Sequence, residues 1–204
     1  MGSPTTSAGL RVPPAWDLPD PYAHIRAEAR VLREHQRLSI AAAAAALVSG
    51  IALAAVAPRT APGVGAVLGA WLVAAGALHL IEAATAGGGS RALTGVGGLL
   101  HVTAGVVCVR GLPGGVEALA VVVGVAWLAG GIAAVLAAVC GPRGDWALRG
   151  AVLTGLVGVA AGLALTFWPA ATLPVVRGVA LAMLAGTGAL HLLLTVRATR
   201  PAAC

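Results

Sequence analysis

Six long stretches without any charged residue dominate this sequence. A helix of about 18–20 apolar residues, rising about 1.5 Å per residue, crosses the hydrocarbon core of a bilayer. The uncharged stretches are residues 38–58, 60–81, 92–109, 118–142, 150–176 and 178–196. Of the 204 residues, 59% are hydrophobic and 10% are charged, whereas about a quarter of a soluble domain is charged. We therefore expect an integral membrane protein rather than a soluble enzyme, a disulfide scaffold or a nucleic-acid-binding domain.

The predicted fold is all-α, with six transmembrane helices. Clusters of Gly and Pro separate the apolar stretches and are typical of turns. The helices are predicted at residues 39–57, 64–85, 93–110, 116–139, 150–168 and 175–196. Around this membrane domain (39–196), the composition predicts a disordered tail at 1–19, an amphipathic helix at 20–38 and a short tail at 197–204.

The placement of arginine predicts the orientation, because cytoplasmic loops carry an excess of basic residues. All thirteen basic residues are arginines, and no lysine occurs, which is the residue usage that a GC-rich genome produces. With the N-terminus inside, only Arg59, Arg110 and Arg177 lie at the outer ends. Nine arginines then lie on the inner side: Arg26, Arg30, Arg33, Arg37, Arg91, Arg143, Arg149, Arg197 and Arg200. We expect a multi-pass protein whose two termini are both cytoplasmic.

The predicted helix at 20–38 carries a basic face. Arg26, Arg30, Arg33 and Arg37 recur every three or four residues, which places them on one side of a helix. One interpretation is an interfacial helix that contacts anionic lipid headgroups, and the alternative is docking of an acidic cytoplasmic protein. The sequence also leaves a homo-oligomer open, and it gives no reason to expect a nucleic-acid partner.

An internal repeat organises the membrane domain. The segment Gly-Ala-Leu-His-Leu at 76–80 recurs at 188–192. In the middle of the chain, glycines and prolines recur 55 residues after those of the first part. Each copy reads as a helical hairpin with a glycine in its first helix, a proline at the outer turn and a glycine late in its second helix. The three predicted hairpins are residues 39–85, 93–139 and 150–196.

This pattern resembles the HdeD family of bacterial six-helix membrane proteins. The clearest match is the third hairpin together with Trp146 just before it. The matching residues are, in order, Trp146, Gly155, Gly158, Gly162, Trp168-Pro169, Gly178 and Gly188. The resemblance implies a bacterial cytoplasmic-membrane protein with a role in stress response and acid resistance. It implies no catalytic motif, and the arginine-rich arm and the membrane histidines depart from the family pattern.

Glu82 and three histidines fall inside the predicted spans, apart from the charged residues at the outer helix ends, and ionisable groups at this depth are costly and are candidates for function. His79 and Glu82 lie on one face of the second span, His101 lies midway along the third, and His191 lies in the sixth. The sequence allows four interpretations of this set.

The first interpretation is a proton relay or pH sensor, and the second is a metal site with His79, Glu82, His101 and His191 as ligands. In the third, Glu82 and the histidines form the acid–base site of an enzyme acting on an isoprenoid or another lipid. In the fourth, the histidines only join helices. The sequence gives no reason to expect a cofactor, and a metal ion bound by these four residues is the alternative to having none.

Two further features concern the ends of the helices. Arg110 and Glu117 flank the third turn, where we expect an ion pair at the outer face. Trp71, Trp127, Trp146 and Trp168 fall mostly near predicted helix ends, as interface anchors do.

Overall fold

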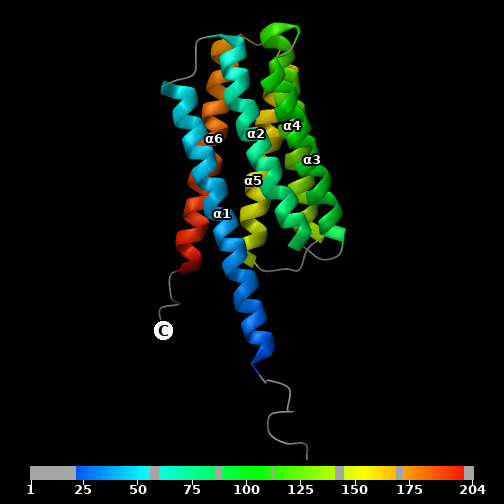
Figure 1. Cartoon of the computed structure of the whole chain (residues 1–204), viewed down its shortest axis with the longest axis vertical. Coiled ribbons are helices and arrows are strands. Elements are labelled where there is room, and N and C mark those ends of the chain that lie inside the picture. Colours follow the sequence, from blue (N-terminus) through cyan, green and yellow to red (C-terminus); the bar gives the residue numbers. More distant parts are fainter. Residues whose placement is uncertain are drawn as a thin grey trace, which may run out of the picture. The chain divides into compact units, whose positions relative to one another are not determined.

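In the computed structural model, residues 22–55, 60–85, 89–111, 113–140, 145–168 and 172–199 are described. Residues 22–34 belong to one compact unit and residues 35–199 to a second. Throughout the described residues, the helices are α1 (Ala23–Ala55), α2 (Ala61–Thr85), α3 (Gly89–Arg110), α4 (Gly115–Cys140), α5 (Asp145–Phe167) and α6 (Leu173–Thr199). From residue 35 onwards, the six helices run side by side (Figure 1).

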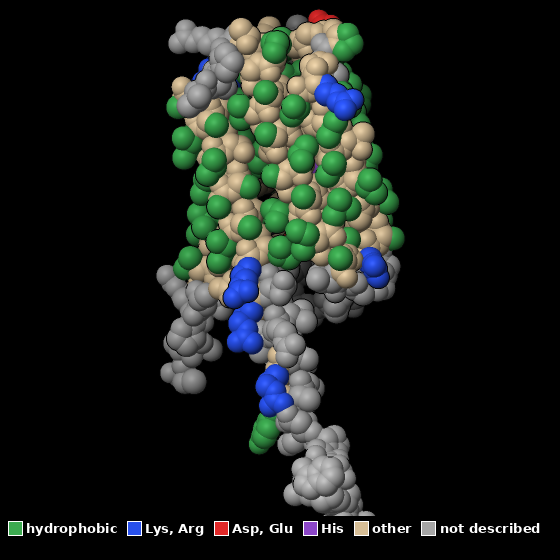
Figure 2. All heavy atoms as spheres, in the orientation of Figure 1, with side chains coloured by type: hydrophobic (Ala, Val, Ile, Leu, Met, Phe, Trp, Pro, Cys, Tyr) green, Lys and Arg blue, Asp and Glu red, His purple; other side chains and the backbone are tan. Residues whose placement is uncertain are grey.

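Each of the six helices contains a segment long and apolar enough to cross a bilayer. Large apolar side chains are also exposed around the bundle, for example Val48 at 65%, Ile51 at 66% and Leu99 at 59%. Figure 2 shows hydrophobic side chains over the visible face of the bundle, with arginines near its ends. A soluble monomer does not expose apolar surface on this scale, so the structure agrees with a multi-pass membrane protein.

Helices α2 to α6 all begin earlier than the sequence predicted, and the early starts of α2 and α6 have a common cause. Their starts are Ala61 rather than 64 for α2, and Leu173 rather than 175 for α6. The carbonyls of Thr60 and Thr172 accept hydrogen bonds from the backbone four residues later, at 3.1 and 3.0 Å. A proline therefore lies within the first turn of each helix. The first turn has no partner for its N–H groups, so a proline there removes nothing from the helix.

The first helix also differs from the expected division. Residues 23–38 continue into the first span as one uninterrupted helix, where the sequence predicted an interfacial helix followed by a separate span. Arg26, Arg33 and Arg37 are exposed on it. The predicted tail at 1–19 lies outside the described residues. At the other end, α6 continues to Thr199, beyond the predicted start of the C-terminal tail at 197.

Glycines bring two pairs of helices into backbone contact. A Cβ atom added to Gly69 or Gly76 of α2 would lie 2.7 or 2.6 Å from the carbonyl oxygen of Gly105 or Gly98 of α3. The same kind of contact joins Gly131 of α4 to α5, where an added Cβ would lie 2.5 Å from a carbonyl oxygen. Helices can approach this closely only where neither carries a side chain. The tightest contacts thus join helices from different predicted hairpins.

The core lies between these helices and includes two tryptophans. Trp71 is 8% exposed and Trp127 is 1% exposed, and their rings meet edge to face with centroids 5.9 Å apart. The expectation that these two residues anchor the protein at the membrane interface is therefore wrong. They fill the space between α2 and α4, whereas Trp168 is 53% exposed and the side chain of Trp146 lies outside the described part.

Candidate functional site

His79 and Glu82 form a contact on one face of α2. The Nδ1 atom of His79 lies 3.3 Å from Oε2 of Glu82, and their side chains are 40% and 34% exposed. One helical turn separates the two residues, so the pairing follows from the geometry of the helix. A carboxylate only accepts hydrogen bonds, so this contact holds a proton on the histidine nitrogen. It becomes an ion pair when the ring takes up a second proton.

His101 of α3 adds a buried ring to this pair. Its side chain is 5% exposed, and its Nδ1 donates to the carbonyl oxygen of Gly97 at 2.8 Å, since a carbonyl can only accept. The ring meets that of His79 edge to face, with centroids 5.6 Å apart and an interplanar angle of 63°. The structure therefore joins three of the four predicted residues in one cluster, the His79–Glu82–His101 cluster.

A glycine contact explains why the two histidines meet. Gly76 and Gly98 each lie three residues before a histidine, and their backbones touch. Helical side chains lean toward the N-terminus of their own helix. Because α2 and α3 are antiparallel, His79 and His101 both lean back toward the level of the glycine contact.

The third side of the cluster is formed by Gly130 of α4. A Cβ atom at this position would overlap the imidazole ring of His101. Gly130 therefore provides the flat surface on which the ring lies, and any larger residue would displace it. Nothing in the sequence distinguishes Gly130 from the other glycines among the 29, because only the packing shows which glycine faces a functional side chain.

The structure places His191 in a different setting, between α6 and α1. Its Nδ1 lies 3.2 Å from Oγ of Ser39, which is 3.4 Å from Oγ1 of Thr195. Thr195 in turn donates to the backbone carbonyl of His191 at 2.8 Å. We call these three residues the Ser39–His191–Thr195 clasp. Ser39 and Thr195 were not among the residues predicted for the site. For Thr195 the sequence does contain a signal, because a threonine one helical turn after a histidine can contact it.

The metal-site interpretation gains no geometric support from this arrangement. Among the residues that the structure describes, no group of three or more His, Cys, Asp or Glu side chains is placed to hold a metal ion. Acid–base chemistry at Glu82 stays a prediction.

At the opposite end of the bundle, Arg177 of α6 reaches the C-terminal end of α1. Its Nε donates to the carbonyl oxygen of Leu53 at 3.0 Å, and its Nη2 donates to that of Ala54 at 2.6 Å. The last carbonyls of a helix have no partner within the helix, and a cation there is favoured by the helix dipole. Arg177, which the sequence marked only as an orientation signal, thus joins two helices.

Arg110 and Glu117 lie where the sequence placed them. Arg110 is the last residue of α3, Glu117 lies in the first turn of α4, and both are exposed. Gly111, Gly114 and Gly115 between them have positive φ angles of 84°, 123° and 67°, which glycine adopts without strain. No contact between the two charged groups is recorded in this described segment, so their ion pair stays a prediction.

Comparison with known proteins identifies no relative of this chain. No family model, no curated protein and no solved structure matches the chain.

Proposed function

We propose that this protein is a pH-responsive membrane protein in which the His79–Glu82–His101 cluster takes up protons. The observation that carries the proposal is the contact between a half-exposed histidine, paired with a carboxylate, and a buried histidine on the next helix. Histidine is the side chain that titrates between about pH 5 and 8 without a special environment. The half-exposed ring gives protons access to a contact that extends into the interior of the bundle.

Protonation would act on the packing between α2, α3 and α4. Two protonated rings with centroids 5.6 Å apart would repel each other by about 3 kcal/mol at an effective dielectric constant of about 20. The Glu82 carboxylate offsets part of this repulsion, because it contacts the His79 ring. On the other side, α4 presents Gly130 to His101, and Gly130 has no charge to offer. Acidification therefore favours a state in which His101 moves away from His79 and from Gly130.

The wider identity is part of the same proposal. The resemblance to the HdeD family agrees with a role in the acid-stress response in a bacterial cytoplasmic membrane. The glycines that touch across α2–α3 have counterparts at the α4–α5 contact. Gly69 and Gly76 correspond to Gly124 and Gly131 at an offset of 55 residues. This supports three tandem hairpins in which the tightest contacts join neighbouring copies.

The arginine distribution supports cytoplasmic termini, and the exposed Arg26, Arg33 and Arg37 support contact of the N-terminal arm with anionic headgroups. We keep this membrane contact as the proposed role of the arm. An acidic protein partner is the alternative occupant of the same basic face.

The experiment follows tryptophan fluorescence of the full chain in lipid nanodiscs from about pH 7.5 to 4, a range that starts above the ordinary titration of histidine and continues below it, because burial disfavours the charged form of an imidazole. Trp127 lies one turn from Gly130 and is buried against Trp71, so movement of His101 changes its surroundings. We expect a sigmoidal change in the wild type that is lost in His79→Gln and in His101→Gln.

His191→Gln is the matched control, because it removes an imidazole from the corresponding place of the repeat, where the partner is Ser39. It should keep the transition. A flat wild-type curve, or an equal loss of the transition in His191→Gln, would rule out the cluster as the sensor.

A further inference from the structure

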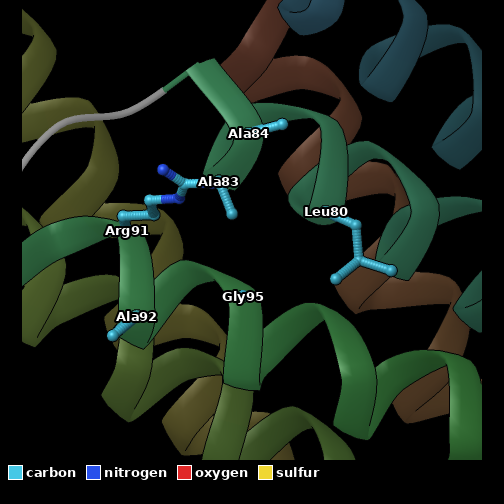
Figure 3. Close-up of a pocket in the computed structure, with 6 residues that line it drawn as sticks. All are labelled: Leu80, Ala83, Ala84, Arg91, Ala92 and Gly95. Carbon is cyan, nitrogen blue, oxygen red and sulfur yellow. The ribbon is translucent and has the colours of Figure 1, made fainter.

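An open pocket lies between the last turns of α2 and the first turns of α3, and it is separate from the His79–Glu82–His101 cluster. Its volume is about 440 Å³, which is within the range of about 300–1,000 Å³ typical of small-molecule sites. Figure 3 shows the Arg91 side chain extending from α3 toward α2, beside Ala83. The lining residues are Leu80, Ala83, Ala84, Arg91, Ala92 and Gly95.

The pocket exists because the two helices separate toward this end. At Gly76 an added Cβ would lie 2.6 Å from a backbone oxygen of α3, whereas at Gly95 it would meet only the Cβ of Ala83, at 3.7 Å. Near Gly95 the helices meet through side chains rather than through their backbones, so a gap opens between them. The small residues that line this gap do not fill it. One wall is therefore apolar and shallow.

The positive charge of Arg91 at the pocket favours an anionic ligand. Arg91 is exposed in the first turn of α3, and that turn carries no acidic residue. A cation at a helix N-terminus is disfavoured by the helix dipole, whereas an anion there is favoured. In the described part of the chain, no acidic side chain is recorded in contact with Arg91. A ligand that brings negative charge would satisfy both the guanidinium and the end of the helix.

The position of the pocket along the spans indicates the kind of anion. The membrane-crossing segments end at Ala84 in α2 and begin at Arg91 in α3, so the pocket lies at the boundary between hydrocarbon and headgroups. A basic residue with an apolar wall at this level matches a lipid that has an anionic headgroup and an acyl chain.

We propose that this pocket binds an anionic phospholipid of the bilayer. The phosphate group pairs with Arg91, and the beginning of an acyl chain packs against Leu80, Ala83 and Gly95. This inference does not depend on the proposed pH response, because no residue of the His79–Glu82–His101 cluster lines the pocket.

The test measures lipid binding to the full chain in detergent by native mass spectrometry, with phosphatidylglycerol compared against phosphatidylcholine. We expect Arg91→Gln to weaken the binding of phosphatidylglycerol by about tenfold, as for the loss of a charge-assisted hydrogen bond. Gly95→Leu should weaken it by a similar factor, because the new side chain fills the pocket and its Cβ meets only Ala83 at ordinary contact distance.

Arg110→Gln is the matched control, since it removes an exposed arginine from the other end of the same helix. It should change binding by less than about twofold, and circular dichroism should show all variants equally helical. Equal affinity for the two lipids, or equal effects of Arg91→Gln and Arg110→Gln, would overturn the proposal. Full competition by inorganic phosphate would also overturn it, and would indicate a site for free phosphate.

Discussion

The contact between α2 and α3 and the contact between α1 and α6 hold their helices together in different ways. Between α2 and α3, glycines place backbone against backbone at Gly69–Gly105 and Gly76–Gly98. Between α1 and α6, the glycines meet side chains instead, and an added Cβ at Gly50 would lie 3.6 Å from the Cβ of Leu184.

Polar contacts join α1 to α6 at both ends of their interface. The Ser39–His191–Thr195 clasp lies at one end, and Arg177 caps the C-terminal carbonyls of α1 at the other. Close packing of small residues and hydrogen bonding between helices are the two principal means of helix association in lipid. In this protein, the α2–α3 contact relies mainly on close packing of glycines, and the α1–α6 contact relies mainly on hydrogen bonds.

The difference also separates two histidines that the sequence makes equivalent. His79 and His191 occupy the same place in the repeated segment at 76–80 and 188–192. At the α2–α3 contact, His79 meets a second imidazole and a carboxylate, whereas His191 meets a hydroxyl group. The first arrangement places a second titratable ring and a carboxylate beside the histidine, and the second places a hydroxyl group beside it. Equivalent positions in a repeat therefore need not share a function.

The largest expected effect comes from Gly76→Ala at the α2–α3 contact. The new methyl group would lie 2.6 Å from the carbonyl oxygen of Gly98, so the helices must separate, and we expect a loss of about 3 kcal/mol of stability. Thermal unfolding in detergent measures it. The matched control is Gly50→Ala at the α1–α6 contact, where the added group has ordinary contact distance. It should be neutral or stabilising by up to about 1 kcal/mol, from helix propensity. Similar losses in both variants would show that the two contacts are equally tight.

An intermediate effect is expected for Arg177→Gln. The substitution removes the charged donor to the carbonyls of Leu53 and Ala54, and we expect a loss of about 1–2 kcal/mol. The same unfolding assay measures it, with Arg110→Gln as a control that removes an exposed arginine of α3. If the two arginine variants unfolded at the same temperature, Arg177 would not be a connection between α6 and α1.

The smallest effect is expected for the clasp. Interhelical hydrogen bonds in membrane proteins contribute on average about 0.6 kcal/mol each, so Ser39→Ala should lower stability by about that amount. A double-mutant cycle of Ser39→Ala with His191→Leu isolates the pairwise energy. A coupling near zero would mean that the 3.2 Å contact contributes nothing to the α1–α6 contact. The role of the clasp would then have to be sought elsewhere.

Much of the fold could be predicted because its determinants are local. A span is recognised by the absence of charge over its length and by the Gly- and Pro-rich turns beside it, and the six predicted spans correspond to α1–α6. The errors at the starts of α2 and α6 have a local cause as well. Pro62 and Pro174 were interpreted as parts of turns, although a helix accepts proline in its first turn.

The candidate site could be predicted only in part. The i,i+3 spacing of His79 and Glu82 predicts their contact from the sequence, because one helix determines it. His101 and His191 also meet residues of other helices, and neither Gly130 nor Ser39 carries a local signal of its role. Trp71 and Trp127 show the same limit. They were assigned to the membrane interface although Trp127 lies midway along the predicted span at 116–139, and their rings fill the space between two helices.

The sequence by itself determined that the chain forms six apolar helices, where their turns lie, and that Glu82 and three histidines lie inside the spans, apart from the charged residues at the outer helix ends. Tertiary structure alone decided which helices touch through glycine, which histidine meets which partner, and where a gap remains beside Arg91. The physical reason is the range of the forces. Hydropathy and turn formation act on neighbouring residues along the chain. The choice of partners depends on how glycine surfaces of distant helices fit together, and many of the 29 glycines look alike until they are packed.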